Sequence, residues 1–118
     1  MRKIITYSLF MYLLLFTFAC KTIPSEPAPN DLIDRDSMVY FLADRAIAEG
    51  IIHYTPAQQD QRQVAANVYL QLYEKYHLTQ ERVDASLQYY LSDKEMATTL
   101  MNDVDKRITE IKKATLGE

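Results

Sequence analysis

Two acids and two histidines come closest, by residue type and spacing, to a metal or acid–base site: Asp44, Glu49, His53 and His77. Glu49 and His53 are four residues apart, so on a helix they share one face and can offer two ligands to a cation. A metal site needs three or four such groups and an ordered surrounding shell, and nothing in the sequence predicts that His77 approaches the pair. The pattern therefore favours solvated or interhelical polar pairing. A metal-dependent or small-ligand role centred on Glu49, His53 and His77 is the alternative.

Other catalytic arrangements find little support. Ser86 stands between Ala85 and Leu87 in a helical stretch, without the strand–turn–helix elbow or the partnered histidine of a nucleophilic serine. The sequence has two glycines and no glycine-rich phosphate loop. An envelope enzyme acting on peptidoglycan would need paired acids in a cleft, which this pattern does not locate. We therefore expect a protein that is not an enzyme and needs no cofactor.

Tyrosines are well suited to contact surfaces, because the ring is apolar and the hydroxyl is polar. In a helical bundle most of them are half-buried packing, and the sequence favours that interpretation. Tyr89 and Tyr90 point about 100° apart on a helix, so at most one lies deep in the core. The residues that we expect at a partner contact are Asp44, Glu49, Tyr89 and Tyr90. The tyrosines that follow the N-terminal region are Tyr40, Tyr54, Tyr69, Tyr73, Tyr76, Tyr89 and Tyr90.

The chain opens with Arg2 and Lys3, followed by an apolar run over residues 4–19. That run is shorter than the about 20 residues that a membrane-spanning helix needs. A basic start and a short apolar run are typical of a secretory signal peptide. We therefore interpret residues 1–19 as a signal peptide.

Cys20, the only cysteine, follows this run directly and is preceded by Thr17, Phe18 and Ala19. This arrangement resembles a bacterial lipoprotein signal, in which the cysteine thiol is acylated, with palmitate among the acyl chains, and becomes the first mature residue. The alternative is an uncleaved signal anchor with an incidental cysteine. Residues 20–31 are rich in proline, so we expect them to form a semi-rigid tether. We expect the protein to bind the membrane through the lipid on Cys20.

The charge of the chain argues against polyanionic partners. It has 13 basic and 16 acidic residues and a net charge of −3, and loss of the signal peptide removes two of the basic residues. Binding to nucleic acids and electrostatic binding to anionic lipids both depend on an excess of lysine and arginine. We expect no nucleic-acid partner and a protein partner in the cell envelope. A single cysteine also leaves no internal disulfide.

Helical signals fill residues 32–118. Asp34 is a good N-cap, Ile33 and Met38 can form a hydrophobic staple, and the first helix should run to about Ile52. The second should begin at a Thr55 cap, with Pro56 and Gln58 in its first turn, and end at His77.

The third helix should be capped by Thr79 and the fourth by Ser92, with Glu95 completing a capping box. The fourth carries a regular apolar stripe and should fray near Gly117. The predicted fold is all-α: a small bundle of three long helices and one short helix, behind a signal peptide and a proline-rich tether. The stripe of the fourth helix is Met96, Leu100, Val104, Ile108 and Ile111.

Residues 32–108 resemble a family of small Bacteroidota lipoproteins that share one helical domain of unknown function. The resemblance is carried by LIDRDSMVYFLADRAIAEG after the tether, by VYLQLYEKYHLTQERVDASLQYY, and by MNDVDKRI in the last helix. Arg45–Ala46 departs from the pattern, in which a more hydrophobic or histidine-bearing stretch is expected. The matching positions are Met38, Leu42, Asp44, Glu49, Tyr69, Tyr76, Thr79, Ser86, Leu87 and Tyr90.

The resemblance implies an outer-membrane lipoprotein and leaves its activity open. Surface-exposed lipoproteins of this phylum resemble one another in carrying acidic residues just after the acylated cysteine. Here CKTIPSE has no acid before Glu26. The resemblance therefore favours a domain that faces the periplasm.

Overall fold

The computed structural model describes residue 1, residues 27–56 and residues 59–117. The elements are α2 (Arg35–His53), α3 (Gln61–Tyr76), α4 (Gln80–Leu91) and α5 (Lys94–Leu116). In these ranges every regular element is a helix, and α4 is the shortest. This confirms the all-α prediction of three long helices and one short one. The predicted signal peptide, Cys20 and most of the tether lie outside the described residues.

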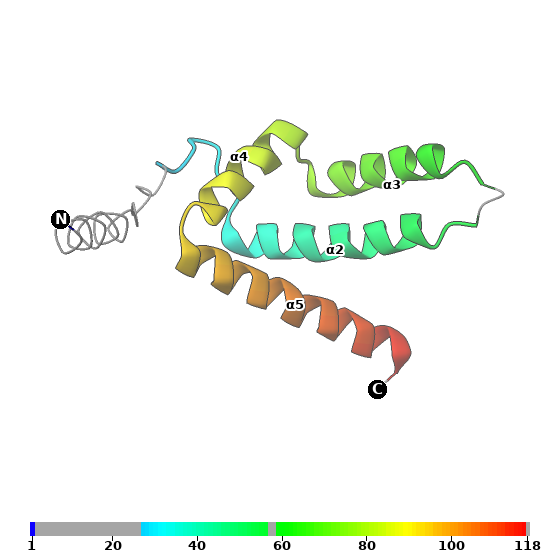
Figure 1. Ribbon diagram of the computed structural model, residues 1–118. Helices are drawn as coiled ribbons and strands as arrows, with labels where there is room; N and C mark the ends of the chain where they lie inside the picture. The colour runs from blue at the N-terminus through cyan, green and yellow to red at the C-terminus, as the bar shows by residue number, and fades with distance from the viewer. Residues whose placement is uncertain (2–26, 57–58, 118) are drawn as a thin grey trace.

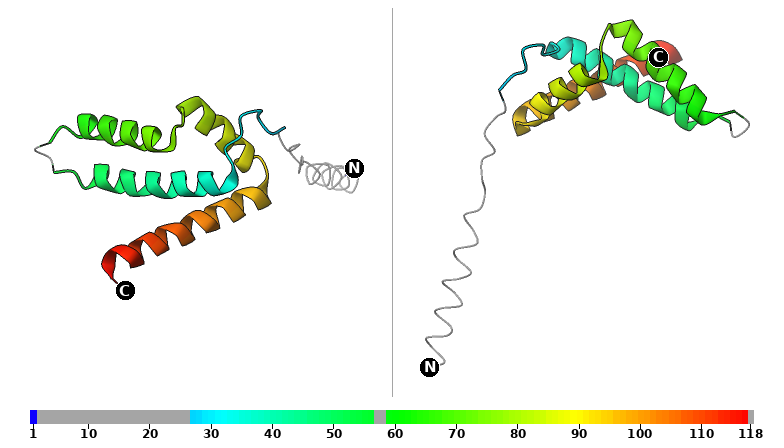
Figure 2. Two further views of the ribbon diagram at one scale, coloured as in Figure 1. Left: turned by 180° about the vertical axis from the view of Figure 1, so that it is seen from behind. Right: turned by 90° about the horizontal axis from the view of Figure 1, so that it is seen from above.

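Helix α2 is the centre of the domain and packs against both α3 and α5. Figures 1 and 2 show α3 folding back antiparallel along one side of α2, while α5 runs in the same direction as α2 along another side. Helix α4 joins α3 to α5 and packs on α5 at the end where the tether enters. At the opposite end α5 diverges from α2, while α3 stays alongside α2.

The start of α2 follows the sequence prediction. The Asp34 carboxylate accepts the Ser37 backbone N–H at 2.9 Å. Hydrogen bonds from the side chain and the backbone of Ser37 lower the pKa of Asp34. Ile33 and Met38 are both buried, as a hydrophobic staple requires. The confirmed cap and staple fix where the chain turns from tether into helix.

The predicted caps of α3 and α5 are wrong, and the reason is the same in both places. The Thr55 hydroxyl donates to the Ile51 carbonyl, and the Ser92 hydroxyl donates to the Tyr89 carbonyl. Both hydroxyls thus bond backwards to the end of the preceding helix. A nearby carboxylate caps the next helix instead.

Asp60 caps α3 by accepting the backbone N–H groups of Arg62 and Gln63, and Asp93 caps α5 by accepting those of Glu95 and Met96. Helix α3 ends at His77, whose φ of 51° places it in the left-handed region. The Thr79 cap of α4 is confirmed, because its hydroxyl accepts the Arg82 N–H at 3.3 Å.

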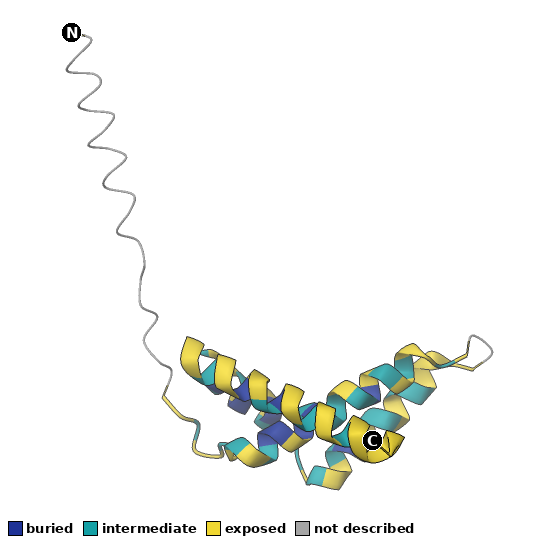
Figure 3. Ribbon diagram, turned by 90° about the horizontal axis from the view of Figure 1, so that it is seen from below, coloured by how far each residue is buried: buried dark blue, intermediate teal, exposed yellow. Residues whose placement is uncertain are grey.

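The core is built from buried residues of all four helices and of the entry segment. Phe41 is fully buried and packs against the rings of Tyr73 and Tyr76, with centroid distances of 5.4 and 5.6 Å. Figure 3 shows that α5 turns an exposed face outward while the buried residues gather behind it. The buried apolar residues of this cluster are Ile33, Met38, Val39, Phe41, Ala43, Leu72, Val83, Tyr90, Leu100 and Val104.

Helix α4 holds the entry segment, residues 31–33, through three side chains one helical turn apart. Arg82 Nε donates to the Asp31 carbonyl at 3.0 Å. The buried Ser86 hydroxyl accepts the Ile33 N–H at 3.0 Å, and the Tyr90 hydroxyl donates to the Ile33 carbonyl at 2.8 Å. Both backbone polar groups of Ile33 are therefore satisfied inside the core. Among the described helices, none is long and apolar enough to cross a membrane.

Candidate functional site

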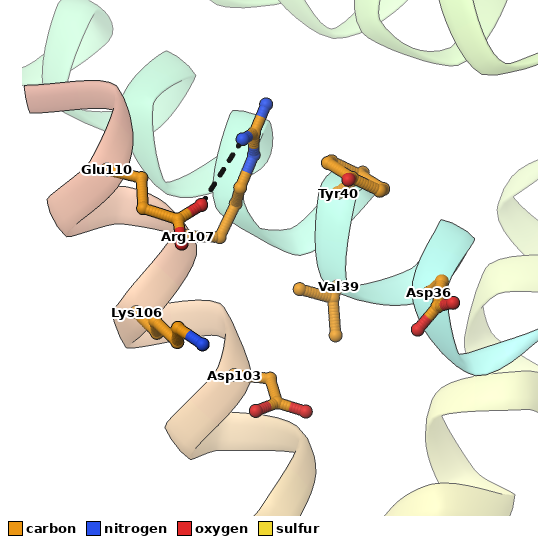
Figure 4. A pocket seen from close by; sticks show the side chains of 7 residues that line it. All are labelled: Asp36, Val39, Tyr40, Asp103, Lys106, Arg107 and Glu110. Atoms are coloured by element: carbon orange, nitrogen blue, oxygen red, sulfur yellow. Dashed lines mark hydrogen bonds and ion pairs between the residues drawn. The ribbon is translucent and has the colours of Figure 1, made fainter. Parts of the chain in front are cut away.

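A hollow of about 310 Å³ lies between α2 and α5, and we call it the α2–α5 cleft. Figure 4 shows side chains from both helices around it. Its floor is the buried side chain of Val39, and its rim is charged on both helices. The lining residues are Asp36, Val39, Tyr40, Asp103, Lys106, Arg107 and Glu110.

Tyr40 and Arg107 form the centre of the cleft. The Arg107 guanidinium carbon lies 4.6 Å from the centre of the Tyr40 ring, a cation–π distance. The Tyr40 side chain is nevertheless exposed, at 46% of its maximum. Arg107 also pairs with Glu110 at 3.4 Å, and its buried Nε has no hydrogen-bond acceptor within the described part of the chain. The arginine is thus held in place with donor capacity left over.

The remaining charges of the cleft lie around this pair. Arg35 forms an ion pair with Asp103 at 2.5 Å, which joins α2 to α5 at one end of the cleft. Asp36 and Lys106 are exposed on its rim. Charged side chains of both signs therefore line the cleft beside the exposed Tyr40 ring.

Asp44 ties α3 to the back of α2. Its carboxylate accepts the Tyr76 hydroxyl at 2.7 Å and the Lys75 ammonium at 2.6 Å. Burial acts to raise the pKa of Asp44, but the hydrogen bonds from Lys75 and Tyr76 outweigh it, so the pKa is lowered. Burial, together with the bond to Asp44, raises the pKa of Tyr76. Asp44, predicted as a partner contact, thus lies in a hydrogen-bond network between two helices.

The structure brings two of the three candidate metal ligands together. Glu49 and His53 line a hollow of about 330 Å³ between α2 and α3. Glu49 is already bound by Arg45 Nε at 3.1 Å and by the Tyr69 hydroxyl at 3.4 Å. His77 lies at the opposite end of α3, which is about 18 Å away along the helix from the residues facing His53. No group of three possible metal ligands occurs within the ranges that the structure describes.

Only one of the adjacent residues Tyr89 and Tyr90 is buried in the core, as their angular separation on the helix predicts. Tyr90 is 7% exposed and belongs to the core, while Tyr89 is half-buried and packs on it edge-on, with ring centroids 5.5 Å apart. Tyr89 is therefore the one of the pair that can reach a partner. Cys20, the predicted lipidation site, lies outside the described residues.

Sequence reasoning did not select Tyr40 and Arg107. The two residues are far apart in the chain, and only the parallel packing of α2 and α5 brings them together. The signal that could have found Tyr40 is its place off the apolar stripe of its helix, where a large aromatic ring is not needed for the core. For Arg107 the sequence offers no such signal.

A comparison with known protein families matches residues 29–114 to the family described as "Domain of unknown function (DUF4296)". The chain belongs to this family. The match spans the entry segment and all four helices, and it stops two residues before the end of α5. Searches of curated proteins and of solved structures gave no match. The DUF4296 domain therefore coincides with the folded unit, including the entry segment that α4 holds.

The structure also explains positions on which the resemblance rested. Asp44 bonds to Tyr76 and Glu49 to Tyr69, so these four residues hold α2 to α3. Ser86 and Tyr90 hold the entry segment. These positions therefore hold parts of the domain together, which leaves the α2–α5 cleft as the candidate site.

Proposed function

We propose that this DUF4296 chain is a lipid-anchored envelope protein whose helical domain binds a partner protein and catalyses no reaction. The observation that carries the proposal is the exposed Tyr40 ring under the Arg107 guanidinium. Tyrosine and arginine are enriched among the residues that contribute most of the binding energy at protein interfaces. Because Arg107 is already fixed by Tyr40 and Glu110, its side chain loses little conformational freedom on binding.

The proposed location is the periplasmic face of a Bacteroidota outer membrane, with the domain tethered through acylated Cys20. The support is the sequence pattern: a basic start, a short apolar run ending in Cys20, and a proline-rich segment.

The partner proposal is tested by placing a photo-crosslinking amino acid at Tyr40 in living cells. We expect irradiation to give a specific protein adduct with Tyr40 replaced, and no such adduct with the cross-linker at Ala66, which is exposed on α3. Adding Arg107→Ala to the Tyr40 variant should reduce the adduct at unchanged protein level. Equal adducts from both positions, or none from Tyr40, would count against a partner site in the cleft.

The anchor is tested by membrane fractionation and intact mass of the wild-type protein beside Cys20→Ala. Wild-type protein should sediment with the outer membrane and show a mass for cleavage before Cys20 plus acyl chains. If both proteins instead retain residues 1–19 and stay in the inner membrane, the lipoprotein assignment is wrong.

A further inference from the structure

The α2–α5 cleft has two levels that are one helical turn apart. At the first level Arg35 of α2 pairs with Asp103 of α5. At the second level Arg107 of α5 lies over the ring of Tyr40 of α2. Residues three or four apart share one side of a helix, so the lining residues of both levels belong to one continuous surface around a cavity of about 310 Å³.

Two charged side chains of this surface have no partner of opposite charge. Asp36 belongs to the first level and Lys106 to the second, and both are exposed. Neither forms an ion pair with another residue in the described ranges, whereas Asp103, Arg107 and Glu110, the other charged lining residues, are each paired. The cleft thus carries one free negative charge on α2 and one free positive charge on α5.

The two free charges lie at opposite corners of the cleft. Figure 4 shows Asp36 and Lys106 on opposite sides of Val39, with Tyr40 and Asp103 at the two remaining corners. A twofold axis along the line from Tyr40 to Asp103 therefore exchanges the positions of Asp36 and Lys106. In a twofold contact each pair of contacting residues occurs twice, so this surface is complementary in charge to a second copy of itself.

The exposed Tyr40 ring lies on this axis. Its side chain is 46% exposed, so a second copy brings its own Tyr40 ring against it, and aromatic pairs contribute more than their buried area alone. A partner surface of a single charge sign would place a like charge against Asp36 or Lys106, which weakens binding. The cleft therefore fits a surface that carries an acid and a base in the same arrangement as its own.

We propose that the partner at the α2–α5 cleft is a second copy of this chain, bound about a twofold axis. Asp36 of each copy pairs with Lys106 of the other, and the two Tyr40 rings meet between these pairs. Copies held on one membrane by the proposed lipid anchor meet at a raised effective concentration, which favours a contact that is weak in solution. This inference rests on the proposed partner-binding function and names the partner.

The test uses cells that co-express the full chain in two forms with different C-terminal tags. A photo-crosslinking amino acid replaces Tyr40 in one of the forms. Irradiation should give an adduct that has twice the mass of the chain and carries both tags. Glu81→Lys, at an exposed acid in the first turn of α4, is the matched charge-reversal control and should leave the yield of this adduct unchanged.

Charge reversal in the cleft separates a contact between copies from other effects. Asp36→Lys in both forms places lysine against lysine, and Lys106→Asp in both forms places acid against acid, so each should lower the yield by about tenfold. When one form carries Asp36→Lys and the other carries Lys106→Asp, both pairs again have opposite charges. The adduct with both tags should then return, which also shows that the two variants fold.

Unchanged yields in the reversed variants, or no recovery from the mixed pair at equal protein level, would overturn the proposal. If the cross-linker at Tyr40 captures a different protein and no second copy, this inference fails alone and the proposed partner-binding function stands. If it captures no protein at all, the proposed function fails with it.

Discussion

At the scale of single residues, Asp44 connects α3 to the central helix. Its folded-state pKa lies below the ordinary value of 3.8 because Lys75 and Tyr76 bond to its charged form. The unfolded chain therefore binds a proton at Asp44 more readily than the folded chain does. The resulting stability is present above the ordinary pKa and is lost as the pH falls through the folded pKa.

We therefore predict that the free energy of unfolding is steady above about pH 5 and decreases in more acidic solution. Asp44→Asn should lower it by about 1.5 kcal/mol at pH 7 and make its acid dependence shallower. Urea titrations between pH 3 and 7 measure both effects. The exposed Asp105→Asn variant is the control, and an equal change in slope for both variants would contradict the assignment.

Ser86 shows how a buried hydroxyl can serve the backbone. It is fully buried and accepts the Ile33 N–H, so Ser86→Ala leaves that donor unsatisfied. We expect a loss of about 1 to 3 kcal/mol in unfolding free energy, measured by urea denaturation. Thr98→Ala, on the exposed side of α5, should change it by less than about 0.5 kcal/mol. Equal losses would mean that the Ile33 bond contributes little.

At the scale of helices, sequence reasoning located each element but misplaced two starts. The Asp34 and Thr79 caps were predictable, because each is followed by a clear helical pattern. At residues 55 and 92 the sequence offers both a hydroxyl and a nearby carboxylate. Which one caps depends on whether the hydroxyl bonds back to the preceding helix, and that bond depends on the path of the chain between helices.

The α5 start gives a direct test of this choice. Asp93→Ala should lower the free energy of unfolding by about 1 kcal/mol, because two backbone N–H groups lose their acceptor. Ser92→Ala should cost less, since its hydroxyl bonds a carbonyl at the end of α4. Thermal denaturation of the two variants measures which substitution lowers the free energy of unfolding more. A larger effect at Ser92 would restore the cap predicted from the sequence.

The candidate site was less predictable than the helices. Asp44, Glu49 and Tyr90 stood out in the sequence, and the structure places them in contacts that hold the fold. Tyr40 and Arg107 did not stand out, because their proximity depends on how α5 lies along α2. Residue spacing within a helix predicts which face is apolar, but it does not predict which polar residues of two distant helices meet.

At the scale of the whole molecule, packing is uneven from one end to the other. The end near the entry segment joins α2, α4 and α5, whereas the opposite end consists of the α2–α3 hairpin and the diverging end of α5. We predict a gradient in amide hydrogen exchange along α2, with Ala43 protected far more than Ile52. Exchange measured by NMR on the purified protein tests this. Uniform protection along α2 would contradict this uneven packing.

The bonds between α4 and residues 31–33 also have a mechanical consequence. If the chain is pulled from before residue 31, the hydrogen bonds of Arg82, Ser86 and Tyr90 to residues 31 and 33 bear the force before α2 does. The load passes sideways into α4 and from there into α5, on which α4 packs. The α2–α3 hairpin lies outside this load path. A pull on the N-terminal side would therefore strain the end of the domain where α4 packs on α5, and leave the α2–α3 hairpin unloaded.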